Sequence, residues 1–94
     1  MIRSALYAPG NVPKMLAKVG TFGADAIVLD LEDAVPAAEK EGARRMVREA
    51  LGHIKGPQRF VRLNGYATGL LQEDLSVVFC PELDGVYVPF ELIS

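Results

Sequence analysis

Cysteine is nearly absent from this sequence, with Cys80 the only one among 94 residues. A single cysteine excludes an intramolecular disulfide, and no CxxC or Cys/His pair suggests structural zinc. This usage favours a reducing compartment. The apolar residues that open the chain soon meet Pro9 and Gly10, so the stretch is too short for a secretory signal or a membrane span. We therefore expect a cytoplasmic protein with no membrane partner.

The chain also lacks an excess of charge of one sign. Ten Lys and Arg stand against twelve Asp and Glu, a net charge of -2. Without a broad basic surface, nucleic acid is not an expected partner. Half of the residues are hydrophobic, and the content of nine Gly and six Pro is ordinary, which excludes intrinsic disorder and collagen-like repetition. We expect one domain, covering residues 1–94.

Short apolar runs alternate with amphipathic stretches along the chain. The runs end in turn or charged residues and predict four strands, at 4–8, 26–31, 59–63 and 85–88. Apolar residues at helical spacing predict three helices between them. Asn11 can cap the first helix, Pro36 suits the first turn of the second, and Pro81 ends the third. The three predicted stripes are Val12, Met15, Leu16 and Val19; Ala43, Met46, Val47, Ala50 and Leu51; and Leu71, Leu75, Val78 and Phe79.

The predicted order is β-α-β-α-β-α-β, an α/β chain with right-handed parallel crossovers. Two architectures have this order. An open sheet needs helices on both faces, and three helices would cover them unevenly. The alternative is the first part of a TIM (β/α)₈ barrel, which takes roughly 250 residues, or about 30 for each unit. The sequence therefore predicts a partial barrel domain.

Three acids lie at the end of the second predicted strand. Asp30 and Glu32 share a face because side chains alternate along a strand, and Asp33 comes next. Carboxylates gathered at one strand end suit Mg²⁺. In the other interpretation Asp33 caps the following helix while backbone amides hold Asp30.

Arg62 interrupts the apolar run of the third strand. A buried guanidinium needs a partner, so Arg62 either pairs with Asp30 or Glu32 in a structural ion pair or holds a substrate carboxylate or carbonyl. Asn64 lies on the same strand face and could add a donor.

Cations and a predicted helix start surround the first turn. Arg3, Tyr7, Asn11 and Lys14 lie there and could form an anion site for phosphates. Alone this pattern is weak, because neither GxxxxGK[ST] nor GxGxxG is present. Lys14 and Lys18, four residues apart, are also typical of a solvated helix face.

Four segments together resemble a known family. RSALYAPGNVPKMLAK, GADAIVLDLEDAVPAAEKEGAR, VRLNG and PELDGVYVP are similar, in order and spacing, to the start of citrate lyase β-subunit-like proteins of the HpcH/HpaI aldolase group. The resemblance implies a TIM barrel that uses Mg²⁺ to cleave or form a carbon–carbon bond in a 3-hydroxy-acyl thioester of the citryl-, malyl- or citramalyl-CoA type. It implies coenzyme A or a carrier protein as the thioester's carrier, a small oxo-acid as the other partner, and a homo-oligomer.

The resemblance also assigns roles to residues. Arg62 matches the catalytic arginine that binds the carboxylate and carbonyl of the oxo-acid. Asn64 is expected to be a further substrate contact from its position on the same strand face, not from the resemblance. Asp30, Glu32 and Asp33 match the acids near the metal and its waters, behind the direct ligands. The segment that lines the nucleotide arm of the thioester corresponds to Arg3, Tyr7, Pro9, Asn11 and Lys14.

The sequence departs from the family pattern after the fourth strand. The family continues with VPK, a valine and a glutamate, whereas Phe90 and Glu91 stand here and the lysine is absent. The acids that ligate magnesium directly belong to later strands of the family. We therefore expect the 94-residue chain alone to be inactive. Two alternatives are a non-catalytic coenzyme A-binding module and a half barrel that self-associates through the open strand at 85–88.

Overall fold

The computed structural model describes residues 4–89, which form a four-stranded parallel sheet in the order β1-β2-β3-β4. Arg3 and the departure at 90–94 lie outside the described residues. Each strand pairs with the next along the chain, as predicted, and each boundary agrees to within one residue. The strands are β1 Ala5–Pro9, β2 Ala26–Asp30, β3 Gln58–Arg62 and β4 Gly85–Tyr87.

Helices follow the first three strands. α1 covers Pro13–Lys18 and continues into a 3₁₀ turn at Val19–Thr21, α2 covers Lys40–His53 after a 3₁₀ turn at Ala37–Glu39, and α3 covers Leu71–Val78 after a 3₁₀ turn at Tyr66–Thr68. Within residues 4–89 no helix is long and apolar enough to cross a bilayer.

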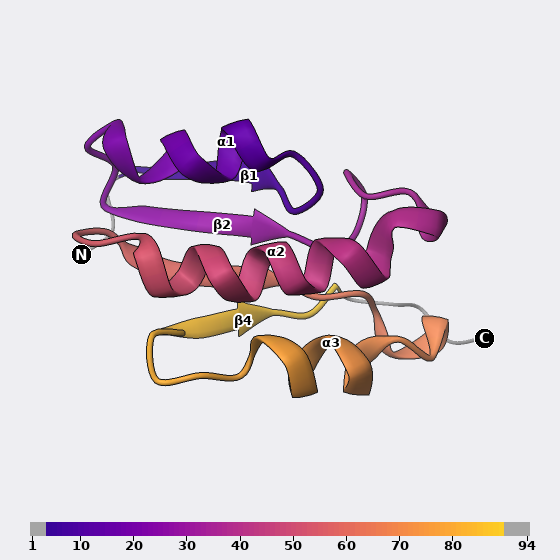
Figure 1. Cartoon of the computed structure of the whole chain (residues 1–94). Coiled ribbons are helices and arrows are strands. Elements are labelled where there is room, and N and C mark those ends of the chain that lie inside the picture. The colour runs from indigo at the N-terminus through magenta and orange to yellow at the C-terminus, as the bar shows by residue number, and fades with distance from the viewer. Residues whose placement is uncertain (1–3, 90–94) are drawn as a thin grey trace.

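All three helices cover the same face of the sheet. Figure 1 shows α1, α2 and α3 side by side in front of the strands, with α2 in the middle. The core lies between the two layers, where alternate strand residues meet the apolar sides of the helices. Its buried members include Ala8, Ile27, Leu29, Val61 and Leu63 from the strand side and Leu16, Val47, Leu51 and Val78 from the helices. One helical layer on a parallel sheet is typical of a barrel wall rather than of a doubly wound sheet.

Asn11 does not cap α1, contrary to the prediction. Val12 is the N-cap residue, and no side chain caps the helix. The reason is Pro13, which begins the helix and keeps the residue before it extended, so that Asn11 is one position too early. Asn11 Nδ2 instead donates a hydrogen bond of 2.9 Å to Glu39 Oε1. This contact links the loop after β1 to the turn before α2.

The predicted apolar stripe of α3 is wrong for two residues. Leu75 is 38% exposed and Phe79, just past the helix, is 75% exposed, whereas Asp74 and Val78 are buried. The helix is rotated from the predicted orientation because Asp74 makes polar contacts inside the core, as described below.

Candidate functional site

Arg62 and Asp30 face each other at the carboxyl ends of β3 and β2, where the strand register pairs them. Arg62 Nε donates to Asp30 Oδ1 at 2.9 Å, and Nη2 donates to Oδ2 at 2.7 Å. This is the bidentate geometry in which a guanidinium and a carboxylate bind most strongly. The pair lies on the sheet face opposite the helices, because Arg62 and Asp30 alternate with core residues Val61 and Leu29.

Two backbone amides also hold Asp30. Glu32 N donates to Oδ1 at 2.8 Å, and Ala34 N donates to Oδ2 at 3.1 Å. Burial alone would raise the pKa of Asp30, but the hydrogen bonds from Arg62 and from these amides hold it below its ordinary value. With four donors on one carboxylate, Asp30 orients Arg62 and shapes the loop after β2. The Asp30 carboxylate therefore has few free lone pairs with which to bind a metal directly. This agrees with the alternative interpretation of the sequence, in which backbone amides hold Asp30.

Glu32 is the second acid beside the guanidinium. Its Oε1 lies 3.5 Å from Arg62 Nε. Burial, together with the charge of Asp33, raises the pKa of Glu32 above its ordinary value. Lys40 fixes the backbone here, since its Nζ donates to the carbonyl oxygens of Leu31 and Glu32 at 2.9 and 3.0 Å. The sequence analysis missed this contact.

Asp33 is exposed and caps neither following helix, which corrects the capping interpretation. Pro36 and Glu39 are the N-cap residues, and neither position has a side-chain cap. Glu32 and Asp33 offer the hard oxygen ligands that Mg²⁺ prefers. Between residues 4 and 89, however, no group of three His, Cys, Asp or Glu side chains could hold a metal ion.

One edge of the Arg62 guanidinium stays open. Nε and Nη2 are engaged by Asp30, whereas Nη1 has no hydrogen-bond acceptor in the described part of the chain. The Arg62 side chain is 29% exposed. The hydrogen bonds that Arg62 donates to Asp30 raise the pKa of Arg62, so the charge of Arg62 is permanent. A fixed cation with a free, partly exposed N–H edge is suited to an anionic oxygen.

The predicted nucleotide-arm residues separate into two groups. Tyr7 and Pro9 lie at the open-face edge of β1, where the Tyr7 ring centroid is 5.6 Å from the guanidinium carbon of Arg62 and Pro9 pairs with Asp30 in register. Asn11 is turned toward Glu39, and Lys14 is exposed on α1. The structure thus brings Tyr7 and Pro9 to the arginine site, but not Asn11 and Lys14.

Asn64 belongs to a buried polar network that the sequence analysis missed. Its backbone N and its Nδ2 both donate to Asp74 Oδ2, at 2.9 and 2.7 Å. Asp74 Oδ1 accepts a 2.7 Å hydrogen bond from Arg44 Nε, and Arg44 Nη1 lies 3.0 Å from Glu73 Oε2. The network joins α2, α3 and the residues after β3. Because the Asn64 side-chain amide donates to Asp74, it lies in the core rather than at the open edge of Arg62.

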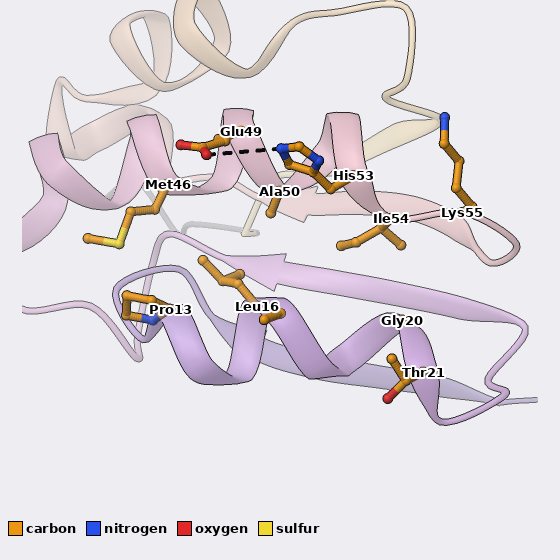
Figure 2. A pocket seen from close by; sticks show the side chains of 11 residues that line it. Pro13, Leu16, Gly20, Thr21, Met46, Glu49, Ala50, His53, Ile54 and Lys55 are labelled. Atoms are coloured by element: carbon orange, nitrogen blue, oxygen red, sulfur yellow. Dashed lines mark ion pairs between the residues drawn. The ribbon is translucent and has the colours of Figure 1, made fainter.

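A separate groove of about 570 Å³ lies between α1 and α2. Figure 2 shows Leu16, Ala50 and Ile54 at the space between the helices, and the Glu49–His53 ion pair, at 4.0 Å, on the side of α2. The groove is formed by the helical layer and is therefore separated by the sheet from the face that carries Arg62.

Comparisons with known proteins agree with this fold. Residues 3–91 match the family described as HpcH/HpaI aldolase/citrate lyase. The chain is 39% identical over 89 residues to citrate lyase subunit beta of Leuconostoc mesenteroides subsp. cremoris, covering 93% of this chain and 30% of that protein. It is also 39% identical over 89 residues to a (3S)-malyl-CoA thioesterase of Cereibacter sphaeroides, covering 93% of this chain and 31% of the relative.

A solved structure gives the same result. The protein CitE from Mycobacterium tuberculosis, in complex with magnesium, acetoacetate and coenzyme A, matches with a TM-score of 0.64 and 31% identity, over 79% of this chain and 27% of that one. The predicted fold, an α/β chain forming the first part of a barrel, is confirmed. The chain spans about a third of the length of the curated relatives that it matches. It belongs to the HpcH/HpaI aldolase/citrate lyase family.

Proposed function

We propose that this chain provides the oxo-acid-binding edge of a Mg²⁺-dependent carbon–carbon lyase. The substrate is a 3-hydroxy-acyl thioester of the citryl-, malyl- or citramalyl-CoA type. The observation that carries the proposal is the bidentate pairing of Arg62 with Asp30, which leaves Nη1 open at the carboxyl edge of the sheet. Ligand sites of parallel barrels lie at this edge. Family membership supports the reaction class. The magnesium bound to the relative CitE supports the use of Mg²⁺.

Arg62 would act through its fixed charge. In the cleavage direction a base removes the hydroxyl proton, the carbon–carbon bond breaks, and the hydroxyl carbon becomes the carbonyl of an oxo-acid. The electron pair of that bond moves to the thioester fragment as an enolate, which then takes up a proton. Arg62 binds the carboxylate of that oxo-acid and stabilises negative charge on the neighbouring oxygen. Because Asp30 orients the guanidinium before substrate arrives, this stabilisation requires little reorganisation. Asp30 is thus a positioning residue.

The thioester arm is assigned to the segment from Arg3 to Lys14, which includes β1. Tyr7 and Pro9 support this assignment because they lie at the same edge as Arg62. Arg3, Asn11 and Lys14 remain part of the proposal, whereas Asn64 is not retained as a substrate contact, because its amide donates to Asp74 in the core. Glu32 and Asp33 would reach Mg²⁺ only together with ligands outside residues 4–89.

Thioester hydrolysis is the second candidate reaction. It is favoured by the likeness to a protein named (3S)-malyl-CoA thioesterase. Arg62 would hold the acid end of the acyl group in the same way. Hydrolysis and cleavage differ in their products, since cleavage yields an oxo-acid and hydrolysis yields a hydroxy-acid and a free thiol.

Arg62→Lys is expected to weaken oxo-acid binding by about tenfold or more, because lysine keeps the charge but loses the planar fork that Asp30 orients. Binding of pyruvate to the 94-residue chain is measured by NMR titration. Arg45→Lys is the matched control, since Arg45 is an exposed arginine of α2, and it should bind as the unaltered chain does. Equal affinity of the Arg62→Lys variant would contradict the proposed role.

Turnover by the 94-residue chain alone is expected to be absent. The described residues supply Arg62 but no complete metal site. The chain is incubated with malyl-CoA or citramalyl-CoA and Mg²⁺, and both oxo-acid and free thiol are quantified. Oxo-acid release at ordinary enzyme rates would overturn this expectation, and free thiol without oxo-acid would support hydrolysis.

A further inference from the structure

Both outer edges of the sheet are open within residues 4–89, because β1 and β4 each pair with one neighbour only. We propose that two copies of this chain close one eight-stranded barrel, in which β4 of each copy pairs in parallel with β1 of the other. The inference does not depend on the role of Arg62. It assigns the second edge and the number of copies, which the open strand at 85–88 alone does not give.

The two edge strands lack the charged side chains that keep sheet edges apart. Residues 5–8 and 85–88 contain no charged side chain. Leu6 of β1, Val86 of β4 and Val88, just past β4, are exposed. Exposed edges of this kind pair with other strands, and natural edge strands are normally protected by charge. Because β1 and β4 run in the same direction, β4 of one copy can continue into β1 of another as a parallel sheet.

The free side of α1 is apolar as well. Pro13 and Ala17 line the groove between α1 and α2, so they mark the side of α1 that faces α2. Met15 lies midway between them in sequence. A helix with about 3.6 residues per turn therefore directs Met15 to the opposite side, away from α2, where it is exposed.

The free side of α3 has a matching surface. Glu73 and Asp74 mark the side that faces α2, because both contact Arg44. Leu75 and Phe79 lie on the opposite side and are exposed. They help to line a hollow of about 530 Å³. A flexible methionine is suited to fill an irregular apolar hollow, so α1 of a second copy can pack here through its own Met15.

The number of copies follows from the geometry of a barrel. Eight strands, each followed by an outer helix, complete a (β/α)₈ barrel, so four strands cover about half of a turn. A head-to-tail interface forms a closed ring when its rotation divides the circle, and a half turn closes with two copies. All three helices cover one face of the sheet, as this closure requires (Figure 1). The face that carries Arg62 then becomes the interior of the barrel.

Sedimentation equilibrium of the 94-residue chain over a range of concentrations measures the number of copies. The expected result is a species of twice the mass of one chain. A monomer at the highest concentration would overturn the inference, because the edges then stay open. A series of ever larger species would also overturn it, because the head-to-tail contact then does not close.

A mixing experiment tests which edges meet. Leu6→Lys and Val86→Glu each place a charge on the helix-facing side of one edge strand, since Leu6 pairs with Ile27 and Val86 with Val61 of the core. Each variant alone has a charge against an apolar side chain in both interfaces, so each should sediment as a monomer. Their mixture should restore the dimer, because one interface is then unaltered and the other pairs Lys with Glu.

The mixture distinguishes head-to-tail closure from other contacts. If β4 of one copy paired with β4 of the other, Leu6→Lys alone would remain dimeric, and that result would overturn the inference, as would a mixture that stays monomeric. Tyr66→Lys, at an exposed tyrosine of the turn before α3, is the matched control and should remain dimeric. Circular dichroism checks that each variant folds. If one does not, Met15→Lys and Leu75→Glu replace the pair and decide the result by the same comparison.

Discussion

Replacing Asp74 with alanine is expected to lower the free energy of unfolding by about 3–5 kcal/mol, the usual cost of removing one partner from a buried ion pair. Asp74 is fully buried and Arg44 is 5% exposed. The substitution leaves the Arg44 guanidinium facing an empty site and removes the acceptor of two Asn64 donors. Urea denaturation followed by circular dichroism measures the loss.

Glu73 provides the matched control because it binds the same arginine from the surface. Its carboxylate lies 3.0 Å from Arg44 Nη1, but its side chain is 71% exposed. Glu73→Ala should therefore cost no more than about 1 kcal/mol. An Asp74→Ala variant that stays within 1 kcal/mol of the unaltered chain would be incompatible with the network described above. An Asp74→Ala variant that is unfolded even without urea would agree with the network.

Replacing Asp30 with asparagine is expected to cost about 2–4 kcal/mol at pH 7, since the Arg62 guanidinium then faces a neutral amide instead of a carboxylate and one oxygen acceptor is lost. Arg62, Glu32 N and Ala34 N then compete for the remaining oxygen. Thermal and urea unfolding measure the difference. Asp33→Asn, at the exposed acid three residues later, should change stability by no more than about 0.5 kcal/mol.

The cost of Asp30→Asn should depend on pH in one direction. The pKa of Asp30 is lower in the folded chain than its ordinary value of 3.8. Its carboxylate therefore stabilises the fold fully above that value, and this contribution is lost as the pH falls through the lowered pKa. The stability gap between the unaltered chain and the variant should be widest near neutral pH and should narrow below pH of about 4. A constant gap down to pH of about 2 would contradict the assigned pKa direction.

The sequence predicts the arginine site well because the strands around it are regular. Apolar runs in the sequence predict the positions of β2 and β3. Because the carboxyl ends of neighbouring parallel strands meet at one edge of the sheet, Arg62 is predicted to lie near Asp30 and Glu32. The sequence leaves open whether Asp30 or Glu32 is its partner. Alternation puts both on one face, but the strand ends at Asp30. Beyond that point the backbone turns to direct the amides of Glu32 and Ala34 to Asp30.

The buried network was missed although a signal for it exists. Arg44 precedes Val47 and Leu51 by three and seven residues, and Asp74 follows Leu71 by three residues and precedes Val78 by four. A charge on the apolar side of each of two successive helices indicates a buried pair. Periodicity of apolar residues alone prefers Leu75 and Phe79, which the structure leaves exposed. Charge complementarity between neighbouring helices decides the orientation of α3.

Strand order that repeats chain order keeps paired strands close in sequence. Each strand of β1-β2-β3-β4 pairs with the strand that follows it, through one crossover. Arg62 and Asp30 lie on two such consecutive strands, 32 residues apart in the chain. Because contacts between segments close in sequence favour fast folding, the pairing of Arg62 with Asp30 needs only the chain between β2 and β3.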